Sequence, residues 1–175
     1  MDPNDREFDD FVHARSPALI RSAYLLTGDQ HLAEDLVQSA LGRTHRAWHR
    51  LRAAGNAEAY TRKVMYHLQV SWWRRGRVVE VLPGTLPDGA ATVPDHAIQA
   101  ELRDAVHGAL MKLAPRQRAV LVLRFFEDRG EAETAEILGV ATGTVKSQTA
   151  KGLRRLREVA PHLNEYGSSP VRHDA

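Results

Sequence analysis

One interval rich in proline and glycine divides this chain of 175 residues into two helical parts. Because proline lacks a backbone donor and both residue types interrupt regular structure, we predict that residues 78–95 form a flexible linker. Fully extended, this linker spans roughly 60 Å at about 3.3–3.6 Å per residue, so the two parts can lie far apart. The interval contains Pro83, Gly84, Pro87, Gly89 and Pro94.

Apolar residues recur at helical spacing on both sides of the linker. Before it, we predict helices from about Phe8 to Thr27, over 33–48 and over 58–77, with Asp29 as a cap and a break at 53–56. After it, the predicted helices cover 98–113, 115–127, 133–138 and 142–157. Pro115 suits a first helical turn, and the apolar run 119–126 is expected to be well buried. The predicted fold class is all-α, with two small helical domains.

Basic residues are concentrated in two stretches, although the formal net charge is only +2. Residues 42–77 contain 9 basic and 1 acidic side chains, whereas residues 1–41 contain 3 basic and 8 acidic ones. Residues 142–157 contain 5 basic side chains and no acidic one. A solvated helix face is the ordinary explanation of such a run, but two dense patches in a short chain favour a polyanionic partner.

Several classes of protein are disfavoured by composition. The chain has no cysteine, so disulfides and thiolate metal sites are absent, as is common in a reducing cytosol. The N-terminus lacks the basic and apolar regions of a signal peptide, and no apolar run is long enough to cross a bilayer. We therefore expect a cytoplasmic protein without membrane insertion.

Residues 133–157 have the pattern of a DNA-binding helix-turn-helix. A short amphipathic helix is followed by Gly139 at the position of a left-handed cap, and by Val140 as the apolar residue between the two helices. On the second helix, Val145, Leu153 and Leu156 are predicted to face inward. An amphipathic hairpin with a solvated basic face is the alternative, but it does not account for the turn and the acid-free helix together.

The outward residues of this second helix divide by chemistry. Hydroxyl, amide and ammonium groups near its start match base edges in the major groove. Cations further along are suited to phosphates, which give affinity but no sequence information. The predicted base-reading residues are Thr142, Thr144, Lys146, Ser147 and Gln148, and the predicted phosphate contacts are Lys151, Arg154 and Arg155.

The motifs of both parts resemble those of sigma-70-type factors of the extracytoplasmic-function (ECF) class, especially its actinobacterial branch. Residues 138–147 and 153–157 resemble region 4, and 115–118 and 124–128 fit region 4.1. Ala33-Glu34-Asp35-Leu36-Val37-Gln38 resembles the region 2.2 signature, and residues 60–77 resemble regions 2.3 and 2.4. The resemblance covers nearly the whole chain, with two motif sets in the expected order around a linker.

This resemblance implies a promoter-specificity factor without catalysis of its own. Domain 2 (6–77) would bind the β′ clamp of core RNA polymerase and the minus-10 element, and domain 4 (96–166) the minus-35 element and the β flap. A tail covers 167–175, and an anti-sigma factor is an expected partner. Asp35 and Gln38, which share a helix face, would contact the polymerase. Opening the promoter requires an unstacked base to be held; the implied minus-10 residues are Asn56, Arg62, Lys63, His67, Trp73, Arg74, Arg75 and Arg77.

Three positions depart from the family pattern. Ala141 stands where a serine commonly caps the recognition helix, a loss of about 1 kcal/mol unless Thr142 replaces it. Arg129-Gly130 replaces a common Leu-Ser, and His67 stands where many members have asparagine. The first two affect where the helices begin, and the third affects the minus-10 preference.

Two other functions explain less of the chain. A stand-alone helix-turn-helix regulator binding duplex operators accounts for 96–166, but not for 33–38 or the basic-aromatic helix. For an enzyme, His45 and His49 have i, i+4 metal-ligand spacing, but no glutamate lies between them and no third ligand is evident. We therefore expect no catalytic residue, no metal, no cofactor and no small-molecule substrate.

Overall fold

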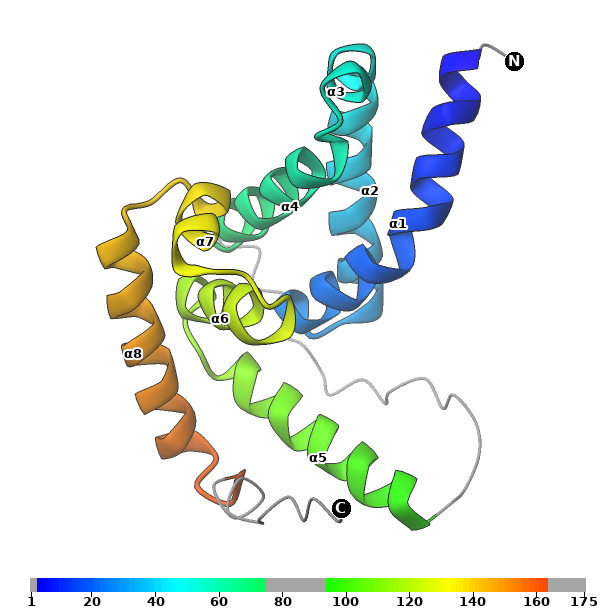
Figure 1. The fold of residues 1–175 in the computed structure, drawn as a ribbon. Coiled ribbons are helices and arrows are strands. Elements are labelled where there is room, and N and C mark those ends of the chain that lie inside the picture. The colour runs from blue at the N-terminus through cyan, green and yellow to red at the C-terminus, as the bar shows by residue number, and fades with distance from the viewer. Residues whose placement is uncertain (1–2, 75–93, 164–175) are drawn as a thin grey trace, which may run out of the picture.

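The computed structural model describes residues 3–74 and 94–163. Within these ranges every regular element is a helix, which confirms the all-α prediction. Most of the predicted linker and all of the predicted tail lie outside the described residues. Figure 1 shows the helices of the two parts packed against each other rather than separated.

The first part consists of α1 (Pro3–Thr27), α2 (Gln30–Arg46), α3 (Trp48–Ala54) and α4 (Ala57–Arg74). The predicted cap is confirmed, because the Asp29 carboxylate accepts a 2.9 Å hydrogen bond from the Leu32 amide. Gly28, which precedes it, has φ of +77°, a conformation that glycine adopts without a steric penalty. These residues turn the chain from α1 into α2, so that the two helices pack side by side.

The predicted helix 33–48 is interrupted at Ala47, whose φ of −102° and ψ of 3° are not helical. Trp48 begins α3 and is buried against Phe8 and Phe11, with ring centroids 5.1 and 5.2 Å away. Aromatic pairs at this separation are favourable beyond their buried area. Tertiary packing of an aromatic side chain therefore accompanies the break, and no local sequence signal marks it.

The second part consists of α5 (Pro94–Met111), α6 (Pro115–Leu121), the π-helical turn η1 (Val122–Phe126), α7 (Glu131–Leu138) and α8 (Thr142–Val159). Pro115 stands in the first turn of α6, as predicted. The predicted helix 115–127 instead widens at its end, where the Glu127 amide donates to the Val122 carbonyl at 3.0 Å. Ala119 to Leu123 are buried, but Phe125 and Phe126 are 57% and 49% exposed, so the prediction of burial through 126 is wrong there.

One hydrophobic core joins the two parts. Leu19, Leu26, Met65 and Tyr66 of the first part pack with Ala119, Val122, Leu123 and Ile137 of the second. In Figure 1, α7 lies beside α4, and α6 lies near the C-terminal half of α1. The linker length permits a wide separation of the two parts, but the structure is the compact arrangement.

Candidate nucleic-acid interface

The helix-turn-helix consists of α7, a tight turn and α8. Gly139 has φ of +66° and ends α7, and the Val140 amide donates to the Ala135 carbonyl at 3.0 Å. Val140 packs with Val120, Ala135 and Val145, of which Val145 is fully buried. The predicted turn and the apolar residue between the helices are both confirmed.

Helix α8 presents a continuous polar face. Leu153 and Leu156 pack toward Leu110, Leu113 and Leu121, as predicted for the inward side. Every residue of α8 that was predicted to contact DNA is exposed or half-buried: Thr142, Thr144, Lys146, Ser147, Lys151, Arg154 and Arg155 are exposed, and Gln148 is half-buried. In the part of the chain that the structure describes, no ion pair engages Lys151 or Arg154. These two cations are therefore available to a polyanion.

Two features of α8 concern its packing and its start; the first was not evident in the sequence, and the second was. Gly152 is buried against α6, and a Cβ there would meet Leu121 Cδ1 at 3.0 Å, so this glycine permits a close crossing of α6 and α8. Ala141 occupies the N-cap position and no side chain caps the helix, so Thr142 does not replace the missing serine. The first turn of α8 also contains no acidic residue, and its Thr144 amide donates to the Ala141 carbonyl at 2.9 Å.

The residues predicted to read the minus-10 element fall into different environments. Asn56 and Lys63 are exposed, on the α3–α4 loop and on α4. His67 is exposed too, but its Nε2 donates to the Ile137 carbonyl of α7 at 3.0 Å. Trp73 and Arg74 lie in the last turn of α4 and their side chains are not described, while Arg75 and Arg77 lie outside the described residues.

Arg62 is the exception, because it is buried between the two parts. Its side chain is 10% exposed and donates to Glu127 at 2.6 Å through Nη1 and to Glu58 at 3.1 Å through Nη2. The Tyr66 hydroxyl donates to the other Glu127 oxygen at 2.8 Å. Burial, and then the Glu127 charge, raises the pKa of Tyr66 well above its ordinary value, so the hydroxyl remains a donor. In this arrangement Arg62 does not face solvent.

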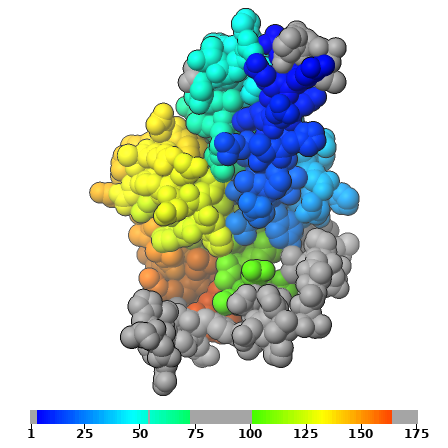
Figure 2. All heavy atoms as spheres, turned by 45° about the vertical axis from the view of Figure 1, so that its right-hand side comes forward, coloured from blue at the N-terminus to red at the C-terminus, as the bar shows by residue number. Residues whose placement is uncertain are grey.

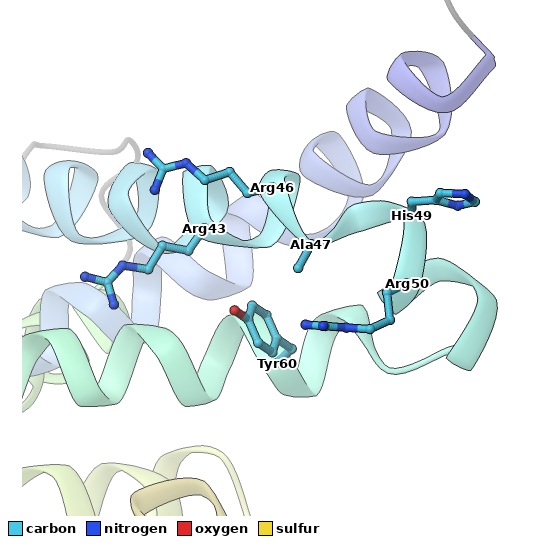
Figure 3. A pocket seen from close by; sticks show the side chains of 6 residues that line it. All are labelled: Arg43, Arg46, Ala47, His49, Arg50 and Tyr60. Atoms are coloured by element: carbon cyan, nitrogen blue, oxygen red, sulfur yellow. The ribbon is translucent and has the colours of Figure 1, made fainter.

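An open depression of about 720 Å³ lies at the junction of α2, α3 and α4. Figure 3 shows Arg43 and Arg46 on α2, His49 and Arg50 on α3 and Tyr60 on α4, with the Arg50 side chain extending toward the Tyr60 ring. The depression is open to solvent rather than enclosed. We call it the Tyr60 pocket; it is lined by Arg43, Arg46, Ala47, His49, Arg50 and Tyr60.

None of the six residues that line the Tyr60 pocket was among the predicted site residues. The excess of basic residues in 42–77 was the signal for it, since three of its arginines belong to that stretch. His45 and His49 do not act together, because His49 lines the pocket whereas the His45 ring packs 4.7 Å from Phe8 and lies 3.9 Å from the Asp5 carboxylate.

Asp35 and Gln38, predicted to contact the polymerase, are both exposed on α2. Between them, Leu36 and Val37 are buried against the core, so the exposed pair lies on the outer side of this helix.

Figure 2 shows from another side that helices of both parts form one continuous body. No helix within 3–74 and 94–163 is both long and apolar enough to span a bilayer.

Two families match the two parts of the chain. Residues 11–78 match the family described as Sigma-70 region 2, and residues 103–156 match Sigma-70, region 4. The RNA polymerase sigma-E factor of Streptomyces avermitilis is 43% identical over 152 residues, which cover 87% of this chain and 84% of that protein. The ECF RNA polymerase sigma factor SigM of Mycobacterium tuberculosis is 31% identical, with 90% and 79% covered.

Solved structures agree with these matches. The sigma factor RpoE in complex with the anti-sigma factor NepR, from Bartonella quintana, is 28% identical, with a TM-score of 0.63 and 88% of this chain and 96% of that chain covered. CnrH in complex with the cytosolic domain of CnrY shares the fold, with 19% identity, a TM-score of 0.64 and 91% of each chain covered. The chain is therefore a promoter-recognition factor that directs transcription initiation, and it belongs to the sigma-70 family as an ECF RNA polymerase sigma factor.

Proposed function

We propose that this sigma factor reads a bipartite promoter, with α8 on the minus-35 element and the first part of the chain on the minus-10 element. The observation that carries the proposal is the polar face of α8, which a helix-turn-helix presents to solvent with two cations outside any described ion pair. We assign residues 6–77 to domain 2, 78–95 to the linker, 96–166 to domain 4 and 167–175 to a tail.

On the minus-35 element, the start of α8 enters the major groove. Thr144, Lys146 and Gln148 are exposed or half-buried there, and their side chains match donors and acceptors on base edges. The Ser147 hydroxyl donates to the Thr144 carbonyl at 3.1 Å, so in this conformation its oxygen serves base edges as an acceptor. Lys151, Arg154 and Arg155 hold the phosphates and set the register of the helix on the duplex.

On the minus-10 element, the Tyr60 pocket holds a base that has left the stack. A tyrosine ring supplies a stacking surface, and the arginines around it neutralise the adjoining phosphates. Asn56 and Lys63 are exposed on the elements that flank the pocket, and we assign them to the same strand. We assign Trp73, Arg74, Arg75 and Arg77 to this element too, together with Arg62 and His67, which contact the second part of the chain in this structure.

Core RNA polymerase binds two separate surfaces in this proposal. The exposed face of α2 with Asp35 and Gln38 contacts the β′ clamp. On domain 4, the exposed Phe125 and Phe126 are large apolar side chains suited to a protein partner, and we assign that side to the β flap. The similar sigma factor RpoE of Bartonella quintana was co-crystallised with the anti-sigma factor NepR, which supports an anti-sigma partner here.

We propose no catalytic role for the chain. Its relatives are sigma factors, which are not enzymes, and the polymerase forms the phosphodiester bonds. Because these relatives act in transcription, we place the protein in the cytoplasm, at the nucleoid when it is bound to polymerase.

Reconstituted transcription tests this function. Core polymerase plus this protein is expected to initiate at a subset of promoters in fragmented genomic DNA, and core alone is not. Absence of both initiation and core binding contradicts the proposal. Tight binding to duplex operators without polymerase would instead favour the stand-alone regulator.

A further inference from the structure

The contact between the two domains engages side chains that we assign to promoter binding. Arg62 and Glu127 form an ion pair of 2.6 Å although they are 65 positions apart, and their side chains are 10% and 7% exposed. Tyr66, which is fully buried, donates to the same carboxylate at 2.8 Å. We call these three residues the Glu127 cluster.

The backbone around Glu127 departs from regular helix at this point. The turn 122–126 is π-helical, and the Arg129 amide donates to the Leu123 carbonyl at 2.9 Å. Asp128 has φ of +52°, which makes it the one non-glycine residue with positive φ in the described ranges. One extra residue in a turn rotates the next side chain by about 100° around the helix axis. The distortion therefore sets the direction of Glu127, and π turns are frequent at functional sites.

Glu127 depends on the closed arrangement more than Arg118, the other charged residue buried at this interface on domain 4. Arg118 donates to the Leu26 carbonyl of α1, but also to the carbonyls of Leu110, Met111 and Leu113 in its own domain. Both side-chain hydrogen bonds of Glu127 are with domain 2, and among the described residues of its own domain only Arg129 Nε, at 4.0 Å, pairs with its carboxylate. Separation of the domains therefore costs Glu127 its close partners, whereas Arg118 keeps three.

The closed arrangement is too compact to read a whole promoter. The minus-35 and minus-10 elements are named by their positions on the promoter, which are about 25 base pairs apart. This spacing corresponds to roughly 85 Å of B-form duplex. A compact chain of this length has a radius of gyration of about 16 Å. The domains must therefore separate before α8 and the Tyr60 pocket can contact both elements of one promoter.

We propose that the Glu127 cluster is an intramolecular latch that keeps the free sigma factor closed and withholds Arg62 from DNA. The closed form leaves Asp35, Gln38 and the Tyr60 pocket exposed, so polymerase and the minus-10 strand can engage domain 2 before the latch opens. The latch itself follows from the contact, and only its effect on DNA binding rests on the proposed function.

The distance between the domains in solution tests the latch directly. Because the chain contains no cysteine, Ala14→Cys and Ala150→Cys introduce a unique pair of spin labels on exposed positions of α1 and α8. The free full-length protein is expected to show one dominant distance, that of the closed arrangement, and opening of the domains should change and broaden it. Glu127→Gln removes the charge but keeps the shape, and it should raise the ratio of open to closed protein roughly tenfold or more, since hydrogen bonds to a buried charge are strong.

Glu7→Gln is the matched control, because it removes the same charge from the exposed Glu7–Arg52 pair within domain 2. It should leave the distance distribution unchanged. Tyr66→Phe deletes one hydroxyl from the cluster and should shift the distribution in the same direction as Glu127→Gln, by less; it serves as the decisive variant if Glu127→Gln loses its helical circular dichroism.

The latch is refuted if the free wild type is already mostly open, or if the folded cluster variants match Glu7→Gln. Reconstituted transcription with the wild type separates this inference from the proposed function. Initiation without a shift in the variants leaves the function and removes the latch. A shift without initiation or core binding leaves the latch and removes the function.

Discussion

Helices α4 and α8 both carry cations predicted to contact DNA, but their environments are opposite. On α8, Lys151 and Arg154 are exposed, and none of the described ion pairs engages them. On α4, Arg62 is buried and held by Glu58 and Glu127. Whether a basic residue on such a helix contacts DNA or the other domain therefore depends on what packs over it. The number of basic residues in a stretch of sequence does not distinguish these two roles.

The comparison predicts its largest effect for Arg62→Ala against Arg154→Ala. Breaking a buried pair leaves Glu127 desolvated, so Arg62→Ala should lower the free energy of unfolding by about 3 kcal/mol. Arg154→Ala should change it by less than about 0.5 kcal/mol, because its side chain is at the surface. Urea denaturation followed by circular dichroism measures both. Equal midpoints for the two variants would remove the distinction between the helices.

The Tyr60 pocket allows the same comparison within domain 2. Its arginines are open to solvent, whereas Arg62 is buried under domain 4. Tyr60→Leu keeps an apolar side chain but removes the stacking ring, and should weaken binding of holoenzyme to minus-10 single strands by about 1–3 kcal/mol. Binding is measured by fluorescence anisotropy with a labelled oligonucleotide. Tyr24→Leu, at a tyrosine far from the pocket in the α1–α5 contact, is the control. Undiminished binding by Tyr60→Leu would exclude the pocket as the base site.

A smaller effect is expected at the start of α8. Ala141→Ser supplies the missing side-chain acceptor and should raise the free energy of unfolding by about 1 kcal/mol. Ala150→Ser, an exposed position within the same helix, is the control and should give no gain. Thermal denaturation compares the two variants, and an unchanged melting temperature for Ala141→Ser would mean that water or backbone already satisfies the first turn.

The smallest effect concerns one phosphate contact. Lys151→Ala should reduce the slope of log K against log salt by about 0.9, which corresponds to about 3.5-fold between 50 and 200 mM salt. Its loss of affinity should be the same for all promoter sequences. Salt titrations of holoenzyme on duplex minus-35 DNA measure the slope. An effect confined to one sequence would instead make Lys151 a base contact.

The helices were predictable because their apolar spacing and turn residues are local. Asp29, Pro115 and Gly139 each act where the sequence alone indicates. The break at Ala47 and the π turn at 122–126 were not predictable, because they accompany packing of Trp48 and of the interdomain core. The same difference between local and long-range determinants applies to the predicted site residues. The α8 face follows from one helix, whereas the fate of Arg62 depends on Glu127, 65 positions away.

The central claim is that the two domains read separate halves of one promoter. The most direct measurement is transcription from a promoter library randomised at both elements, with wild-type and variant holoenzymes. Gln148→Ala should change base preference only in the minus-35 half, and Tyr60→Leu only in the minus-10 half. If either variant changes the preferences of the other half, or if neither changes any, the division between α8 and the Tyr60 pocket is wrong.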